Sequence, residues 1–182
     1  PATHTSRREE TFYMVAVEVK DRKRVEEALE AYIAPEIVEY AWRDGGKRER
    51  TSKRVLIKKP PRHLLIHLKR FEFDLETLTQ RKINSRFEFG KTLNLAPYMT
   101  ENNEYAVDGK CLYELSGIVV HAGTAHSGHY YAFIKCKDHE WIEDNDSYVA
   151  PIDIDTELDY DCFGGIEQQK NPSRTRNGRT YD

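Results

Sequence analysis

Residues 113–149 read YELSGIVVHAGTAHSGHYYAFIKCKDHEWIEDNDSYV, and their pattern sets the architecture expected for the rest of the chain. Apolar runs stand on both sides of a glycine-rich loop at 122–128, which predicts two strands joined by a turn. Further strands are expected at 141–144 and near 148–150. A series of short strands joined by turns is typical of an antiparallel sheet.

Within this segment, a histidine and an Asn-Asp pair have the pattern of a catalytic site. His129 follows Gly128 directly and begins a strand, so a rigid element holds its imidazole beside a loop. Asn145 and Asp146 follow the next strand, and two returning strands bring such a side chain against the ring. Cys–His–Asn/Asp arrangements activate a thiol by lowering its pKa. By spacing alone, an ordinary surface histidine is the alternative interpretation.

The chain before this segment predicts more strands and one helix. Apolar residues recur at helical spacing between Asp21, a candidate cap, and Pro35, which ends the pattern. Strands are expected over residues 11–19, 55–59, 63–71 and 86–95, a charged turn at 43–50 and a polar loop at 100–110. The fold class is therefore α+β, dominated by antiparallel strands.

Composition narrows the class of protein. The chain has 182 residues, a net charge of -3, 32% charged residues and 38% hydrophobic residues, which suits one polar but foldable domain. Neither a general nucleic-acid binder nor a membrane-spanning segment is indicated. Cys111, Cys136 and Cys162 contain no Cys-x-x-Cys pair, which argues against a disulfide framework and for a reducing compartment. We expect a cytoplasmic and/or nuclear location.

Several blocks of the sequence, in the same order, resemble the ubiquitin-specific protease family of cysteine deubiquitinases. Leu115–Ile134 is similar to the family's His box, and Trp141–Ser147 to its Trp-x-x-Phe-Asn-Asp segment. Residues 61–74 (PRHLLIHLKRFEFD) and 12–40 resemble the blocks before them. Residues 158–165 (LDYDCFGG) look like the end of the domain in the very large members. The resemblance covers about residues 11–165.

The resemblance implies a papain-like cysteine protease palm with an antiparallel sheet and part of the β-fingers. The expected organisation is a polar stretch at 1–10, a partial catalytic domain at 11–168 and a disordered tail at 169–182. The thumb, carried by the N-terminal half of the domain, is missing from this picture, so apolar surface is expected to be uncovered. The implied partners are ubiquitin, ubiquitinated proteins and that missing half. No organic cofactor is implied.

The resemblance implies a catalytic or substrate-binding role for individual residues of this chain. His129 matches the general base, Asn145 the third triad member and Asp146 the adjacent acid. The residues that match the channel for the ubiquitin tail are His121, Gly123, Gly128, Tyr130 and Tyr131. The implied enzyme is a thiol-dependent deubiquitinase that hydrolyses the isopeptide bond after ubiquitin's C-terminal glycine.

One departure concerns the nucleophile. The family's Cys box precedes every block found here, and none of the three cysteines opens a helix with Gly and Asn around it. The isolated chain is therefore expected to be inactive. The alternative function is a non-catalytic ubiquitin-binding or scaffold module derived from the same fold.

A second departure concerns zinc, which many family members hold with two Cys-x-x-Cys pairs in the fingers. Here the positions of one pair fall on Trp42 and Gly45, which do not ligate zinc, so no metal is expected. In addition, Asp144 replaces the usual Phe, and its carboxylate faces either the imidazole or solvent.

Other polar clusters allow competing interpretations. The histidines at 121, 126 and 129 could be read as a metal site, but their irregular spacing argues against it. The basic residues of 43–54 suggest either a nucleic-acid patch or a solvated turn. Late carboxylates would pair with arginines of the ubiquitin tail or form a solvated edge. They are Glu140, Glu143, Asp144, Asp146, Asp153 and Asp155.

Overall fold

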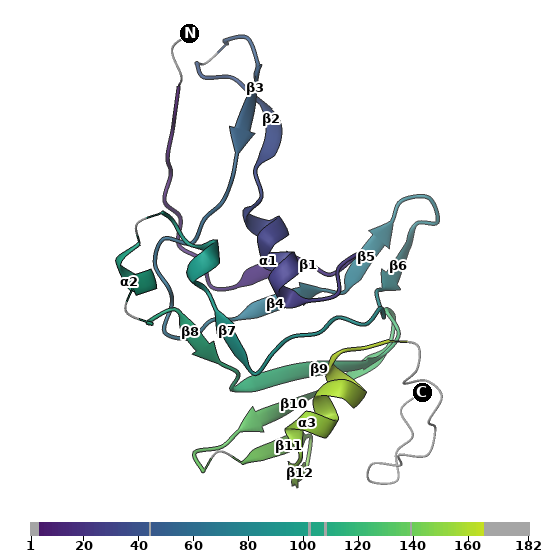
Figure 1. Ribbon diagram of the computed structural model, residues 1–182. Coiled ribbons are helices and arrows are strands. Elements are labelled where there is room, and N and C mark those ends of the chain that lie inside the picture. Colours follow the sequence, from purple (N-terminus) through teal and green to yellow (C-terminus); the bar gives the residue numbers. More distant parts are fainter. Residues whose placement is uncertain (1–3, 44, 102, 108, 139, 166–182) are drawn as a thin grey trace.

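The computed structural model describes residues 4–43, 45–101, 103–107, 109–138 and 140–165 (Figure 1). The strands are β1 (Val15–Glu18), β2 (Glu36–Tyr40), β3 (Glu49–Lys53), β4 (Ile66–Lys69), β5 (Phe71–Asp74), β6 (Thr79–Lys82), β7 (Thr92–Asn94), β8 (Leu112–Glu114), β9 (Gly117–Gly123), β10 (Gly128–Lys135), β11 (Trp141–Asn145) and β12 (Tyr148–Ile152). The helical elements are α1 (Val25–Ile33), the 3-10 turn η1 (Ala96–Tyr98), α2 (Glu104–Val107), α3 (Ile154–Glu157) and the π-helical turn η2 (Leu158–Cys162). The tail expected at 169–182 lies outside the described residues.

The antiparallel sheet predicted from residues 113–149 is present. Its strands lie in the order β12-β11-β10-β9, and every neighbouring pair is antiparallel. The pairing of Ala132 with Asp144 and of His129 with Ala122 fixes its register. Because side chains alternate along each strand, this register decides which of them share a face. In Figure 1 this sheet forms the lower part of the molecule, with α3 against it.

Two apolar clusters hold the molecule together. One lies where α1 packs over β1 and includes the fully buried Val17, Leu29, Phe87 and Leu95. The other lies where α3 and η2 pack on the β9–β12 sheet. Its buried members are Val120, Phe133, Trp141, Ile154, Leu158 and Cys162. Among the described residues, no helix is long and apolar enough to cross a membrane.

The helix α1 begins later than the sequence indicated. Asp21 was expected to cap it, but this residue has a φ of 60° and lies in a turn before the helix. The N-cap is Arg24, which makes no side-chain capping bond. Glu27 instead accepts a hydrogen bond from the Lys23 backbone N–H, which satisfies a donor beside the helix start. The helix ends before Pro35, as predicted.

Three other predictions about local structure were wrong in part. Residues 55–59 form only an isolated bridge, between Ile57 and Met99, because the two prolines that follow cannot extend a hydrogen-bonded strand. Within residues 86–95 only β7 is a strand. The loop at 100–110 contains the short helix α2, and Asn103 Oδ1 accepts from the Tyr105 N–H at its start.

The β2–β3 hairpin projects from the body, and the N-terminal segment runs beside it (Figure 1). Trp42, at a position where the resemblance would place a zinc ligand, contacts the Tyr40 ring edge-on with centroids 5.2 Å apart. The His4 ring lies 5.6 Å away on the same indole. Aromatic contacts of this kind stabilise the hairpin by apolar burial.

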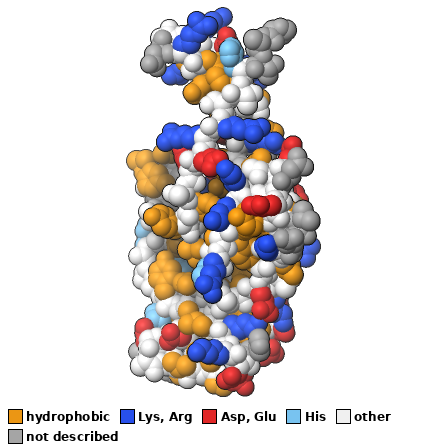
Figure 2. Space-filling model, turned by 90° about the vertical axis from the view of Figure 1, so that its left-hand side faces the viewer, with side chains coloured by type: hydrophobic (Ala, Val, Ile, Leu, Met, Phe, Trp, Pro, Cys, Tyr) orange, Lys and Arg blue, Asp and Glu red, His pale blue; other side chains and the backbone are white. Residues whose placement is uncertain are grey.

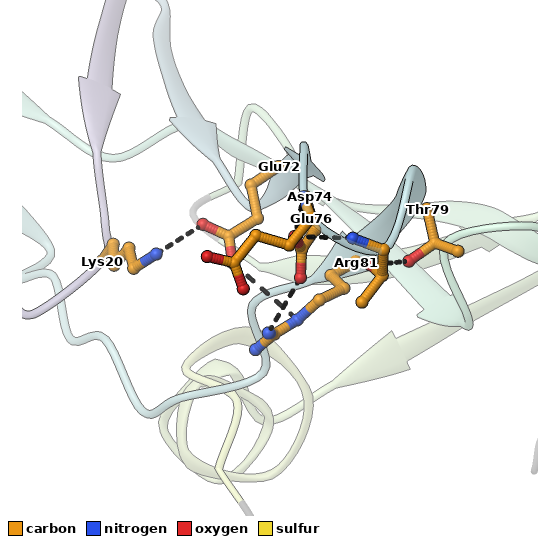
Figure 3. Close-up of polar contacts among 7 residues, drawn as sticks. Lys20, Glu72, Asp74, Glu76, Thr79 and Arg81 are labelled. Atoms are coloured by element: carbon orange, nitrogen blue, oxygen red, sulfur yellow. Dashed lines mark hydrogen bonds and ion pairs between the residues drawn. The ribbon is translucent and has the colours of Figure 1, made fainter.

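The β5–β6 hairpin carries an exposed network of charges, drawn in Figure 3. Glu72 accepts a hydrogen bond of 2.9 Å from Lys20, and Arg81 lies within 4 Å of both Glu72 and Asp74. Backbone N–H groups of Thr77 and Glu76 bond Asp74 and lower the pKa of its carboxyl. Solvent screens such exposed pairs, so the network orients the hairpin more than it stabilises the fold.

Replacing Asp153 by Ala should destabilise the protein by about 1 kcal/mol, because this side chain caps α3. Its Oδ1 accepts from the Asp155 N–H at 3.1 Å, and its Oδ2 accepts from the Thr156 hydroxyl at 2.9 Å. Urea unfolding measures the loss. Asp144→Ala, at an exposed strand position, is the matched control and should change stability by less than about 0.5 kcal/mol. Equal losses in both variants would contradict the capping role.

Candidate active site

The sheet brings His129 of β10 against Asn145 at the end of β11. The His129 Nε2 and Asn145 Oδ1 atoms are 2.6 Å apart, and Asn145 is only 6% exposed. Since a carboxamide oxygen can only accept, the ring nitrogen Nε2 carries the proton of this bond. The other nitrogen, Nδ1, is then the basic atom of the neutral imidazole.

Asp146 lies beside this pair but interacts less strongly. Its Oδ2 is 4.0 Å from His129 Nε2, and its side chain is 59% exposed. Asp146 has a φ of 55° in the two-residue turn between β11 and β12, a conformation that Asp tolerates better than most residues. At this distance and exposure its carboxylate does not fix the orientation of the ring.

The buried carboxylate near the site belongs to Glu143 rather than Asp144. Asp144 is exposed on the opposite face of β11 and does not point toward the imidazole. Glu143 is 3% exposed, and its Oε1 accepts a hydrogen bond of 3.0 Å from Asn145 Nδ2. Because side chains alternate along a strand, the spacing of Trp141, Glu143 and Asn145 already indicates that these three side chains share one face of the sheet.

The residues matched to the tail channel are divided between two faces of the sheet. Tyr131 shares the face of His129, and the two rings are nearly parallel with centroids 6.3 Å apart. Tyr130 and its cross-strand partner His121 lie on the other face, with ring centroids 4.6 Å apart. Phe71 contacts His121 edge-on at 5.2 Å.

Burial lowers the pKa of the His121 imidazole, and the nearby Lys82 ammonium lowers it further. Its Nδ1 is buried without a hydrogen-bond partner among the described residues. The ring lies within an aromatic cluster with Phe71 and Tyr130. Across the described ranges, no group of three or more His, Cys, Asp or Glu side chains is arranged to hold a metal ion.

Gly123 and Gly128 close the β9–β10 hairpin directly before His129. Gly123 has a φ of 105°, and a Cβ there would lie 2.6 Å from the Ser127 carbonyl oxygen. The connection is tighter than the loop expected at 122–128, because the Thr124 N–H donates to the Ser127 carbonyl at 2.8 Å. Glycine at both strand ends allows this close packing, because a Cβ at Gly128 would lie 2.2 Å from His121 Nε2.

Lys82 anchors this hairpin from β6, a contact that the sequence did not indicate. Its Nζ donates to the carbonyl of His121 at 2.7 Å and to that of Gly123 at 2.9 Å. Burial lowers the pKa of the ammonium, and Arg70 lowers it further. The local sequence does not predict this contact, because its acceptors are backbone carbonyls, which every residue has.

We expect Lys82→Met to speed hydrogen exchange of the amides in residues 121–128 by at least about tenfold. A hydrogen bond from a charged donor contributes roughly 1.5–3 kcal/mol. Without that bond the hairpin opens locally more often, and its amides exchange faster. Mass spectrometry of deuterium uptake measures the change. Lys91→Met is the control, because its ion pair with Asp155 lies elsewhere on the surface. Unchanged exchange in Lys82→Met would contradict the anchoring role.

A hollow of about 1390 Å³ adjoins the site. Residues of β4, β8, β9 and β10 and the segment after η2 line it, and Asn145 and Glu143 reach it. Large apolar side chains that line it are exposed, among them Leu65, Val119 and Tyr130. Figure 2 shows a face of the molecule on which hydrophobic side chains gather over the body, while several Lys and Arg side chains lie on the projecting tip.

Together the fold and the His–Asn pair define a class of protein. The fold is α+β and papain-like, and a histidine oriented by an asparagine is the arrangement found in papain-like cysteine hydrolases. Residues 3–173 match the family model described as Ubiquitin carboxyl-terminal hydrolase. The chain therefore belongs to the ubiquitin carboxyl-terminal hydrolase family, as part of a ubiquitin-specific protease catalytic domain.

Similar curated proteins are much longer. The chain is 34% identical over 203 residues to the probable ubiquitin carboxyl-terminal hydrolase FAF of Drosophila melanogaster, covering 98% of the chain and 7% of that protein. It is 32% identical over 188 residues to human ubiquitin carboxyl-terminal hydrolase 34, covering 89% of the chain and 5% of that protein. The chain thus spans less than a tenth of either relative.

Solved structures of similar shape confirm the fold. The SAGA Ubp8/Sgf11/Sus1/Sgf73 DUB module bound to ubiquitin aldehyde contains a chain with a TM-score of 0.72 and 30% identity. The match covers 84% of this chain and 34% of that one. A variant SAGA DUB module bound to monoubiquitin gives a TM-score of 0.69 at 32% identity, over 81% and 33% of the two chains.

Proposed function

We propose that this chain supplies the His–Asn half of the active site of a thiol-dependent deubiquitinase. The enzyme hydrolyses the isopeptide bond after the C-terminal glycine of ubiquitin. The observation that carries the proposal is the 2.6 Å contact of His129 Nε2 with the buried Asn145 oxygen, which leaves Nδ1 as the base. Family membership and the ubiquitin bound to similar structures support the substrate.

In the proposed reaction, a cysteine thiol gives its proton to His129 Nδ1, and the thiolate attacks the glycine carbonyl carbon. The carbon–nitrogen bond then breaks, and the imidazolium returns the proton to the leaving lysine amine. Water, deprotonated by the same nitrogen, hydrolyses the thioester and releases the thiol. Asn145 holds the ring, and Asp146 stabilises its charged form.

The proposed path of the ubiquitin tail runs beside the β9–β10 hairpin. The backbone of Gly128 is exposed there, and its Cβ direction is filled by the His121 ring, 2.2 Å from Nε2, so the peptide would approach the hairpin from its other side. Tyr131 lies beside the imidazole, whereas Tyr130 and His121 would contact substrate only from the opposite face of the sheet. Of the matched tail-channel residues, the glycines and Tyr131 are therefore the main proposed contacts.

The nucleophile in this proposal comes from outside residues 1–182. Cys111 is buried, with its sulfur 3.1 Å from Met99 Sδ and 3.2 Å from the Tyr105 carbonyl. Cys162 is buried in the apolar cluster under η2, and Cys136 follows the end of β10 opposite to His129. The exposed apolar hollow is the surface that the cysteine-bearing half would cover.

Release of a fluorophore from the C-terminus of ubiquitin tests the proposal. The isolated chain should show no turnover, and the parent catalytic domain that includes its preceding half should show turnover. Turnover by the isolated chain would overturn the assignment of the nucleophile. A parent domain that binds ubiquitin without turnover would instead establish the non-catalytic binding module.

The sparse cysteines, with no Cys-x-x-Cys pair among them, support a cytoplasmic or nuclear site of action.

A further inference from the structure

We propose that Glu143 is a positioning residue that fixes the orientation of the Asn145 amide, and through it the tautomer of His129. This inference rests on the proposed function, because it assigns a role within the same site. Glu143 and Asn145 are two residues apart on β11, so both side chains lie on the face of the sheet that carries His129. They are 3% and 6% exposed, and a 3.0 Å hydrogen bond joins them.

A carboxylate at this position is costly for the fold. Its neighbours on this face include Trp141 on the same strand and Phe133 directly across from it on β10, both buried in an apolar cluster. Burying a charged group without compensation costs several kcal/mol, and an apolar residue of similar size would pack here without that cost. The polar contact with Asn145 is one feature that an apolar residue could not reproduce.

This contact decides which end of the amide faces the ring. A carboxamide can present either its oxygen or its NH2 group to a histidine, and the two ends have almost the same shape. The Glu143 carboxyl oxygen accepts the 3.0 Å bond from Asn145 Nδ2, so the NH2 group of Asn145 points to Glu143. Its oxygen is then left facing His129 Nε2, at the observed 2.6 Å.

The direction of the amide in turn selects the imidazole tautomer. With the oxygen toward Nε2, the neutral ring carries its proton on Nε2 and keeps Nδ1 able to accept one. With the amide reversed, the NH2 group would donate to Nε2 and favour a proton on Nδ1. That second tautomer could not take a thiol proton at Nδ1, so Glu143 keeps the ring in the form that can act as a base.

The same contact makes Asn, rather than Asp, the suitable residue at position 145. An Asp there has no hydrogen to donate, and its carboxylate would lie within hydrogen-bonding distance of a second buried carboxylate. Two such groups repel each other unless one is neutralised. The identity of residue 145 should therefore be coupled energetically to that of residue 143.

Nitrogen-15 NMR of the histidine-labelled chain tests the proposal, with His129→Gln used to assign the signals of His129. At a pH where the ring is neutral, wild type should show the Nε2–H form, and Glu143→Gln, whose amide can accept from or donate to Asn145, should show it less completely. Glu143→Leu should shift the ring to a mixture of the two tautomers. The signals of the other histidines report that the variant is folded. An unchanged tautomer in folded Glu143→Leu would overturn the proposal.

A second comparison covers the case in which Glu143→Leu does not fold. Asn145→Asp alone should lower the Tm by about 5 °C, and adding Glu143→Gln should recover at least half of that loss. An equal loss in both backgrounds would overturn the coupling. Neither measurement requires turnover, so a negative result here leaves the proposed deubiquitinase function standing. Conversely, a failed ubiquitin assay does not change the tautomer result.

Discussion

His129→Gln in the parent catalytic domain should lower kcat for ubiquitin–fluorophore hydrolysis by about 10³-fold. A positioned general base contributes roughly 10²–10⁴-fold, and here the same nitrogen serves both the attack and the departure of the amine. Glutamine preserves much of the volume and can still bond the buried Asn145, so the loss should come from proton transfer rather than from misfolding. The KM for ubiquitin should change by less than about threefold, since the change removes no surface along the tail path.

The matched control for this experiment is His126→Gln. His126 is exposed in the β9–β10 connection, three residues before His129, and it makes no contact with Asn145 among those described. Its kcat should stay within about twofold of wild type. A loss in kcat of less than tenfold for His129→Gln, or equal losses for the two variants, would remove His129 from the proposed mechanism.

Gly128→Ala should destabilise the chain by about 2–3 kcal/mol and disable the site as well. A Cβ at this position would lie 2.2 Å from His121 Nε2 and 2.4 Å from the Ala122 carbonyl oxygen. The imidazole cannot move aside easily, because Phe71 and Tyr130 pack against it, and a backbone carbonyl moves only if the strand moves. Overpacking of this kind typically costs roughly 1–3 kcal/mol.

Gly128→Ala would displace the backbone directly before His129. Separation of β9 from β10 at Gly128 shifts the following residue relative to Asn145, so the 2.6 Å contact should lengthen and kcat should fall by about 100-fold. Gly117→Ala, at the other end of the same β9–β10 pair, is the control. Its Cβ would meet only the Phe133 carbonyl oxygen at an ordinary 3.6 Å, so stability should change by less than about 0.5 kcal/mol. Equal urea midpoints for the two variants would contradict the crowding argument.

The β9–β12 sheet and the His129–Asn145 pair could both be predicted from the sequence, because their signals are local. Alternation along each strand and short turns between strands define an antiparallel sheet without any knowledge of the rest of the fold. The parallel pairing of β1 with β4 could not be predicted in this way. It joins segments about fifty residues apart in the sequence, with α1, β2 and β3 between them in the chain, so no local pattern predicts it.

The supporting residues of the site were missed for a different reason. The sequence indicates that Glu143 is one of several solvated or substrate-facing acids, because carboxylates are seldom buried. Its strand position nevertheless placed it on the face of Asn145. Lys82 gave no signal at all, since its partners are backbone carbonyls of a distant hairpin. Contacts of these kinds depend on tertiary structure rather than on residue type.

The central claim is that His129 activates a cysteine that residues 1–182 do not contain. Its most direct test is to trap the nucleophile of the parent domain with ubiquitin carrying a C-terminal electrophile, and to locate the modified cysteine by mass spectrometry. We expect the adduct on a cysteine that precedes this chain in the parent protein, with formation slowed at least tenfold by His129→Gln. An adduct on Cys111, Cys136 or Cys162, or one whose rate does not depend on His129, would contradict the claim.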